Sequence, residues 1–264
     1  MSLDFTLARY RELCKAILSS GYTPMTVLQY LESSGPPGRF AIIRHDVDRS
    51  VGNARRMAQL ESDLGMSATY YFRYRKGTFR PDTMIDMARM GHEIGYHYEA
   101  VDKARGDCRR AVEIFEREIS AFREFVQVKT ISMHGNPLTR WDNRDLWREH
   151  DFRSYGVLGE AYLSFNDVLY LSDTGRTWGH GYKVKDWLPG SEGGEQRMPV
   201  GSELQTTCDL IRLVETGQSH HLYLNTHPER WAYSTPSWLV SLVKDKAVNA
   251  VKWALSLKSS LKSR

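Results

Sequence analysis

Short apolar runs alternate with stretches of helical periodicity along most of the chain. Apolar runs bounded by polar or turn residues predict buried strands, whereas apolar residues at three- and four-residue spacing predict amphipathic helices. The predicted strands are residues 40–43, 68–72, 92–96, 128–133, 168–171 and 221–225. The predicted helices are residues 4–19, 49–64, 81–90, 104–125, 202–215 and 236–260. This alternation indicates parallel βαβ units, so we expect an α/β fold with a single domain over residues 1–264.

Polar clusters follow the predicted strands. They read His-Asp-Val-Asp, His-Tyr-Glu, His-Gly-Asn-Pro, Ser-Asp-Thr-Gly-Arg and Thr-His-Pro-Glu-Arg, in chain order. In parallel α/β folds the carboxyl ends of the strands face one mouth, where active sites assemble. We therefore expect these clusters to form a single site.

Asp46 and Asp48 are the acidic residues of the first cluster. With one residue between them in an extended chain, their side chains point to the same side. Two carboxylates this close either split their pKa values or share a cation. The alternative is that Asp48 only caps the helix that starts near Arg49, because Asp is a common capping residue.

Three histidines occupy positions from which they can reach the same mouth. His97 ends its strand, and His134 and His227 follow theirs. Imidazole binds metals and substrate oxygens, and its unperturbed pKa near neutrality suits it to general acid catalysis. For His97 and His134 the alternative is a purely structural, hydrogen-bonded histidine. His92, at the start of its strand, is expected to be structural.

The segment from residue 172 to residue 178 offers candidate ligand-binding side chains. Asp173 and Arg176 could bind a polar ligand, and Trp178 could stack on a sugar ring. The alternative for the two charged residues is that they pair with one another and hold a loop.

Composition narrows the class of protein. The chain has 264 residues, of which 41% are hydrophobic and 26% are charged with both signs mixed, as in soluble globular proteins. Its 3 cysteines are scattered, which argues against a disulfide framework and favours a reducing compartment. The amino terminus lacks the apolar core of a signal peptide, and no apolar stretch is long enough to span a bilayer. We therefore expect a cytoplasmic protein.

The net charge of +4 is concentrated near the end of the sequence, where residues 244–264 carry most of the excess of lysine and arginine. The rest of the chain is close to neutral, which argues against nucleic-acid binding. Residues 236–260 have helical periodicity, with Trp238 and Trp253 beside the lysines. This helix either packs on the barrel with a solvated basic end or makes peripheral contact with an anionic inner membrane.

One motif carries a family resemblance. The sequence Gly91-His-Glu-Ile-Gly-Tyr-His97 is similar to a motif of the polysaccharide deacetylases, carbohydrate esterase family 4. In that family Gly-His-Glu-Ile-Gly-x-His leads into a metal-binding His-[Ser/Thr]-x-x-His. His97 matches the first of those metal-binding histidines, so the resemblance implies that it is a metal ligand.

Two looser matches extend the resemblance over roughly residues 40–227. The segment from residue 44 to Asp48 resembles a variant of the family's opening motif, which implies that Asp46 is the catalytic base and Asp48 a metal ligand. The segment from residue 222 to His227 resembles the closing motif, whose histidine is the catalytic acid.

The chain also departs from the family pattern. Val101 stands where the second metal-binding histidine is expected, and Tyr98 replaces the usual Ser or Thr. The Arg-x-Pro-x-Gly motif is absent, and Met133-His-Gly-Asn-Pro137 stands roughly in its place. His134 or Glu99 is therefore the candidate third ligand, unless the metal site is weak or lost, and Glu99 is also a candidate substrate-binding residue.

The resemblance implies a distorted (β/α) barrel of about seven parallel strands. It also implies a metal-dependent hydrolase that removes an N-acyl group, most simply N-acetyl, from a sugar. The cofactor would be a divalent metal, with zinc preferred and cobalt, iron or nickel as alternatives.

A cytoplasmic enzyme would meet glycan precursors, so we expect a nucleotide-linked or lipid-linked glycan substrate in lipopolysaccharide or exopolysaccharide biosynthesis. The alternatives are an amidohydrolase acting on a non-sugar C–N bond and a degenerate, non-catalytic glycan-binding or assembly protein.

Overall fold

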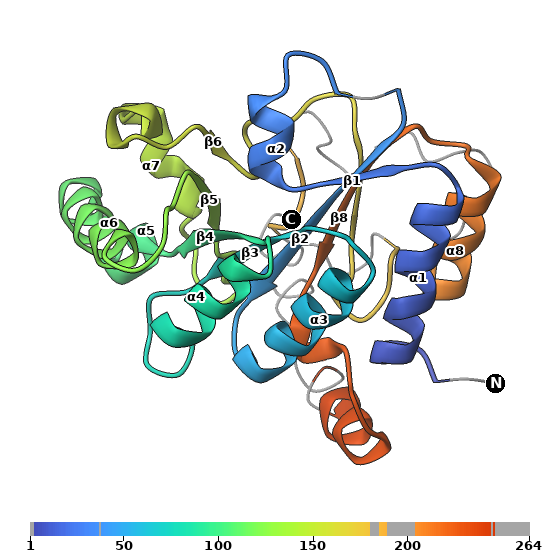
Figure 1. The fold of residues 1–264 in the computed structure, drawn as a ribbon. Coiled ribbons are helices and arrows are strands. Elements are labelled where there is room, and N and C mark those ends of the chain that lie inside the picture. The colour runs from blue at the N-terminus through green and yellow to red at the C-terminus, as the bar shows by residue number, and fades with distance from the viewer. Residues whose placement is uncertain (1–2, 37, 180–184, 189–203, 244, 246–264) are drawn as a thin grey trace, which may run out of the picture.

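A parallel β-sheet forms the centre of the molecule (Figure 1). The computed structural model describes residues 3–36, 38–179, 185–188, 204–243 and 245. The strands run in the order β6-β5-β4-β3-β2-β8-β7, and β1 pairs with the amino-terminal half of β2. Their bounds are β1 Thr23–Met25, β2 Phe40–Val47, β3 Thr69–Phe72, β4 Glu93–Tyr98, β5 Thr130–Met133, β6 Gly159–Glu160, β7 Leu169–Ser172 and β8 His221–Thr226. The expected parallel α/β fold is confirmed.

Helices cover the outside of this sheet, and α1 and α8 lie side by side (Figure 1). The α-helices are α1 Leu7–Ser19, α2 Val27–Glu32, α3 Val51–Asp63, α4 Pro81–Arg89, α5 Ala100–Lys103, α6 Cys108–Arg123, α7 Leu146–Glu149 and α8 Thr207–Thr216. Short 3-10 helices are η1 Asn143–Asp145, η2 Phe152–Tyr155 and η3 Pro228–Arg230. Residues 235–243 are also helical.

Side chains close the curled sheet into a distorted barrel. The Tyr223 hydroxyl on β8 donates to the Ala161 carbonyl just after β6, at 2.9 Å, although β8 and β6 are not neighbours in the sheet. Arg44 on β2 likewise donates to Ser132 Oγ on β5, at 2.5 Å. Contacts between strands that are not neighbours require strong curvature, so the expected distorted (β/α) barrel of about seven parallel strands is confirmed.

Strand β2 is buried along its whole length and positions the candidate site. Arg44 and Asp46 face the barrel interior. His45 points to the other face of the sheet, where it is buried against α3 and contacts Glu61. The sequence predicted a strand of residues 40–43 only. The strand continues to Val47 because these polar side chains each have a buried partner, which removes the cost of carrying them into the interior.

The predicted helix of residues 104–125 is wrong in its first part. Residues 104–107 form a turn between α5 and α6, in which Gly106 has a φ of 88° that favours glycine, and only α6 lies within the predicted range. A Cβ at Gly106 would lie 2.3 Å from the Trp141 side chain, so the turn is also packed too tightly for another residue. Asp107 then caps α6 by accepting from the Arg110 backbone N–H.

The two terminal helices were both predicted. Helix α1 begins at Leu7 with Thr6 as its N-cap. Of the predicted helix 236–260, residues 236–243 are helical, and most of the remainder lies outside the described residues. Among the helices that the structure describes, none has both the length and the apolar character needed to cross a membrane.

Candidate active site

The predicted site residues converge at the carboxyl ends of β2, β4, β5 and β8. Asp46 lies near the end of β2, and Asp48 follows this strand directly. His97 lies near the end of β4, where it pairs in register with Ser132 of β5. Strand order places β2 beside β8 and links β2 to β5 through β3 and β4. This topology brings together side chains that are far apart in the sequence.

Asp46 is held by a bidentate ion pair. Arg44 Nε donates to its Oδ1 at 2.9 Å, and Arg44 Nη2 donates to its Oδ2 at 2.7 Å. Asn225 Nδ2 adds a third hydrogen bond at 3.2 Å. Burial raises the pKa of Asp46, but Arg44 and then His97 oppose this effect and bring the pKa below its usual value. Asp46 is therefore an oriented carboxylate, and the proton that it accepts must come from an acidic donor.

Asp48 stands between two imidazoles. Its Oδ1 lies 3.5 Å from His97 Nε2 and 3.5 Å from His134 Nε2, and it is buried without a hydrogen-bond partner. Burial raises the pKa of Asp48, but the imidazoles of His134 and His97 lower it well below its usual range. The N-cap of α3 is Ser50, so the alternative that Asp48 caps this helix is wrong.

The Nδ1 atom of each imidazole faces an acceptor. His97 Nδ1 lies 3.0 Å from the Ser132 carbonyl, which can only accept, so in the neutral ring Nδ1 carries the proton and Nε2 has the lone pair. His134 Nδ1 lies 3.4 Å from Glu99 Oε2. Metal-binding histidines commonly have an acceptor at the second nitrogen, which fixes the tautomer and the ring orientation.

Glu99 is engaged by cations and is thus a poor candidate for direct metal binding. Arg73 donates to Glu99 Oε2, and Lys103 Nζ lies 3.3 Å from Oε1.

Burial lowers the pKa of His134 to about 4, although Asp48 opposes this effect. A neutral imidazole can offer its lone pair to a metal. Of the two candidate third ligands, His134 is therefore favoured, and its Nδ1 faces Glu99.

Two donor pairs of the site have the spacing that the ligands of a divalent transition metal require. Ligands about 2.1 Å from a tetrahedral ion lie about 3.4 Å from one another, close to the two 3.5 Å distances from Asp48. Its unpartnered, buried Oδ1 is an atom for which a cation would be the natural partner. The rings of His97 and His134 stand at 89° with centroids 5.3 Å apart. In the part of the chain that the structure describes, however, no three such side chains close around one point.

His227 is oriented by Asp173. His227 Nδ1 donates to Asp173 Oδ1 at 2.7 Å, and Arg230 and Trp231 also donate to this carboxylate. Burial and Arg230 lower the pKa of His227, but Asp173 and Asp46 more than offset them, so this pKa is raised. His227 is thereby suited to hold and donate a proton at neutral pH.

The structure corrects three expectations about substrate-binding residues. Asp173 is fully buried and serves His227, and it does not pair with the Arg176 side chain. Arg176 pairs with Asp245 at 3.1 Å. Trp178 is also fully buried, and its Nε1 donates to Thr207 at 3.1 Å. Its ring packs between other aromatic residues of the core and cannot stack on a sugar in this conformation.

Two comparisons found no match: no family model and no curated protein matches the chain. Among solved structures, the chain is similar to a carbohydrate esterase family 4 pseudoenzyme from Bacillus anthracis, at 12% identity over 81% of this chain with a TM-score of 0.41. It spans 62% of that chain, and 64% of a mutant of the same protein with restored enzymatic activity.

A further similar structure is the peptidoglycan deacetylase PdaC from Bacillus subtilis, at 12% identity over 87% of this chain and 96% of that chain, with a TM-score of 0.41. These structures belong to the kind of protein that the sequence motifs resemble. At such identities and TM-scores, any assignment of activity has to rest on the site itself.

Sequence reasoning missed several residues of the site. Arg44 and Asn225 hold Asp46, and Arg73 lies between Glu99 and Asp48, with Nη1 3.9 Å from Asp48 Oδ1. The period of two along β2 was a signal for Arg44, because it places Arg44 and Asp46 on one face. The remaining missed residue is Glu229, whose carboxylate oxygens are both buried without a hydrogen-bond partner.

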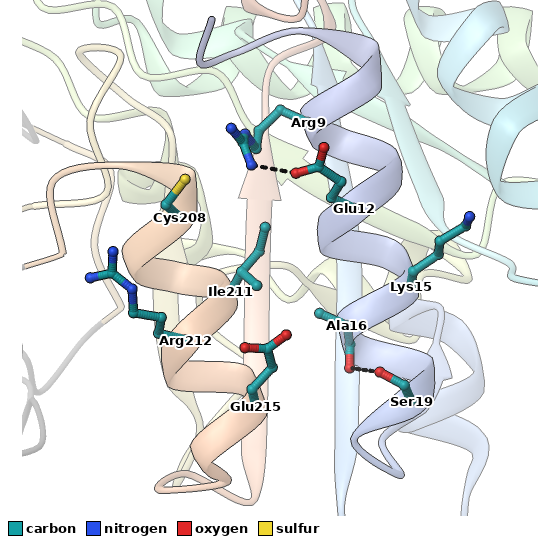
Figure 2. A pocket seen from close by; sticks show the side chains of 9 residues that line it. All are labelled: Arg9, Glu12, Lys15, Ala16, Ser19, Cys208, Ile211, Arg212 and Glu215. Atoms are coloured by element: carbon teal, nitrogen blue, oxygen red, sulfur yellow. Dashed lines mark hydrogen bonds and ion pairs between the residues drawn. The ribbon is translucent and has the colours of Figure 1, made fainter. Parts of the chain in front are cut away.

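A groove elsewhere on the surface has no part in this site. It lies between α1 and α8 and has a volume of about 510 Å³ (Figure 2). Figure 2 shows that its wall carries charges of both signs, among them Arg9, Glu12 and Glu215. None of the candidate site residues lines it.

Proposed function

We propose that the chain is a metal-dependent hydrolase that removes an N-acyl group, most simply N-acetyl, from a sugar or glycan precursor. The observation that carries the proposal is that the pKa values of two site residues, Asp46 and His227, are shifted in opposite directions. The pKa of Asp46 is lowered and that of His227 is raised, so a base and an acid stand ready together at neutral pH.

The chain's own residues would perform the proton transfers. Asp46, fixed by Arg44, accepts a proton from the attacking water. His227, fixed by Asp173, donates a proton to the nitrogen of the departing amine. Each transfer contributes roughly 10²- to 10⁴-fold to the rate in enzymes of known mechanism.

Asp48, His97 and His134 would hold the metal, with zinc as the first choice for a site of two imidazoles and a carboxylate. A bound divalent cation supplies Lewis-acid polarisation of the acyl carbonyl and acidifies water. The low pKa of Asp46 makes such acidification necessary, because a weak base deprotonates only an acidic water molecule. In this proposal a metal held by Asp48, His97 and His134 would therefore acidify the water molecule from which Asp46 takes a proton.

The finer assignments are also proposals. A nucleotide-linked or lipid-linked glycan of surface polysaccharide biosynthesis is the proposed substrate, met in the cytoplasm. Peripheral membrane contact is supported by the helical residues 235–243, where Leu239, Val240 and Val243 are 53%, 55% and 67% exposed. Vesicle co-sedimentation with and without anionic lipid tests this contact, which is absent if the full chain ignores anionic vesicles at low salt.

One observation favours the alternative of a non-catalytic glycan-binding protein. Val101, which stands at the place of the family's second metal-binding histidine, is buried in α5 among apolar residues and cannot bind a metal. The oriented acid and base argue against this alternative, since a binding module needs neither.

Elemental analysis of the purified protein tests the metal proposal. We expect about one divalent ion per chain in the wild type and clearly lower occupancy in Asp48→Ala, His97→Ala and His134→Ala, since each removes one donor. His221→Ala is the matched control, because His221 lies at the opposite end of β8 from the site. Full occupancy in His134→Ala would contradict the assignment of the third ligand.

A further inference from the structure

A buried polar network lies behind the candidate site, on the outer face of the sheet. It joins Glu61 of α3, His45 of β2 and Thr226 of β8, each of which is at most 1% exposed. His45 Nε2 lies 2.8 Å from Glu61 Oε1, and His45 Nδ1 lies 2.5 Å from Thr226 Oγ1. The proton transfers of the proposed mechanism use none of these three side chains.

Glu61 holds the imidazole of His45 in one place. Tyr10 and Tyr70 donate to the two oxygens of Glu61, Tyr70 at 2.6 Å. An ionised carboxylate accepts hydrogen bonds and cannot donate them, so His45 Nε2 carries the proton of its bond to Glu61. The Tyr70 ring stacks on the imidazole with centroids 4.2 Å apart. A hydroxyl either donates or accepts, so Thr226 completes the network in either protonation state of His45.

A hydroxyl, an imidazole and a carboxylate in this order also form the catalytic triads of hydrolases. Thr226 cannot act as a nucleophile here, because it is buried and no substrate reaches it. Side chains alternate along a strand, so His45 and Thr226 point away from the face that carries Asp46. The network therefore acts on the geometry of the site and not on the substrate.

The network lies at the point where β2 and β8 separate. His45 and Thr226 are the last pair in the register of these two strands, and Asp46 and His227 are the next residues along them. Strand β7 pairs with β8 only as far as the residue before Thr226, and the His227 backbone N–H donates to the Asp173 side chain. His227 thus lies beyond both strand pairings, and the bond between His45 and Thr226 ties β2 to β8 directly before it.

Helix α3 connects the network to the segment that follows His227. Asn53, near the start of α3, donates through Nδ2 to the Pro228 carbonyl at 3.1 Å and to the Trp231 carbonyl at 3.2 Å. Glu61, near the end of α3, contacts β2 through His45. One helix therefore bonds to the strand that carries the proposed base and to the segment after the proposed acid.

We propose that the Glu61–His45–Thr226 network fixes the position of His227 relative to Asp46, and that its members are positioning residues of the site. Catalytic groups must be held closely, since a misplacement of about 1 Å can cost ~10²-fold in rate. The expected effect on turnover rests on the proposed function, whereas the expected effect on the position of His227 does not.

The test compares the full-length wild type with Thr226→Val, which keeps the shape of the side chain and loses the hydroxyl. Acetate release from a tetramer of N-acetylglucosamine is measured with zinc, at a temperature where both proteins are folded. We expect kcat to fall by about 10-fold or more with KM unchanged. The imidazole NMR signals of His227, assigned with His227→Ala, should shift in Thr226→Val without any substrate.

Two further variants sharpen the test. Thr226→Ser restores the hydroxyl and should recover the wild-type kcat and the wild-type His227 signals. Glu61→Gln keeps the size of the side chain and removes the charge that holds His45. It should change kcat and the His227 signals in the same way as Thr226→Val, and it replaces that variant should Thr226→Val fail to fold.

Thr130→Val is the matched control. Thr130 is also buried, and its hydroxyl donates to Glu93 and lies 2.9 Å from the Tyr71 hydroxyl. It begins β5, at the end of the sheet opposite to the site. Thr130→Val should lower the melting temperature through the loss of a buried hydrogen bond, yet keep the wild-type kcat and His227 signals.

Each result decides one question. Wild-type kcat or unmoved His227 signals in Thr226→Val, or in Glu61→Gln where only that variant folds, overturn the positioning role and leave the proposed function intact. An equal loss of kcat in Thr130→Val also overturns it, because lost stability would then explain the effect. A wild type that releases no acetate overturns the proposed function, and the His227 signals alone then support or overturn the positioning role.

Discussion

Asp46 and Asp48 are two residues apart, yet the protein treats them differently. Asp46 accepts hydrogen bonds on both oxygens from Arg44 and Asn225. Asp48 has a buried oxygen that no group in the described part of the chain contacts by a hydrogen bond. The same contrast divides the site, since His227 is fixed by Asp173 whereas His134 Nδ1 makes no hydrogen bond within the described residues.

This comparison shows which half of the site the protein organises by itself. The acid–base half, Asp46 and His227, is complete without a ligand, because buried ion pairs and hydrogen bonds fix each of these catalytic groups. The metal half leaves buried polar atoms unsatisfied, and such atoms destabilise the folded chain unless a ligand binds them.

The largest effect is expected from Asp46→Asn. This variant removes the base, so turnover should fall by about 10²- to 10⁴-fold while metal content stays at the wild-type level. Arg44 then loses its charged partner in a buried place, which should lower the melting temperature as well. Steady-state kinetics and elemental analysis of one preparation measure both. Near-normal turnover would show that another group is the base.

Metal removal should lower stability as well as turnover. With free metal at about 100 times its Kd, binding stabilises the folded state by about 2.7 kcal/mol, or on the order of 5–10 °C in Tm for a chain of this size. Calorimetry with zinc and with a chelator measures the difference. Asp48→Ala should melt at the same temperature in both buffers. A wild type whose melting temperature is also the same with zinc and with the chelator would contradict the proposed metal binding.

Asp173→Asn should change the pH dependence of turnover. His227 must be protonated to donate, so activity falls as pH rises through its pKa. Asp173 raises this pKa, and loss of its charge should move the alkaline limb of the profile to lower pH. The loss at neutral pH should be smaller than the ~10²-fold or greater loss in His227→Ala. An unmoved alkaline limb would assign that limb to another group.

The smallest effect is expected from Trp178→Phe. This variant loses the hydrogen bond to Thr207 and some packing, which should cost about 0.5–1.5 kcal/mol or somewhat more. Because Trp178 is buried away from any ligand, KM should remain unchanged. Chemical denaturation and kinetics separate the two effects. A large increase in KM with unchanged stability would restore the sugar-stacking role.

The sequence predicted the convergence of the site because parallel strands carry their carboxyl ends to one mouth. Asp46, Asp48, His97, His134 and His227 all lie at such ends, and the structure brings them together. Six of the eight strands were predictable from their apolar runs, whereas the short strands β1 and β6 were not predicted. The turn at Gly106 was missed because the predicted helix was started four residues too early, at residue 104, although Gly106 and the N-cap Asp107 precede α6.

The partners of these residues could not be predicted. Asp173 meets His227 across 54 positions of sequence, a pairing that depends on the register of β7 and β8. Trp178 illustrates a different difficulty, since an aromatic residue in a polar segment suits a sugar site and a core equally well. Only the packing of Phe5 and Trp231 around it decides between them.

The central claim is that a metal-dependent acid–base site hydrolyses an N-acetyl group. The most direct measurement is acetate release from an N-acetylated oligosaccharide by the chelator-treated protein, before and after addition of zinc or cobalt, with Asp46→Asn treated in parallel. The account predicts acetate release by the wild type only after metal addition, and at least ~10²-fold less by the variant. Acetate release that is equal with and without metal, or equal in the two proteins, would contradict it.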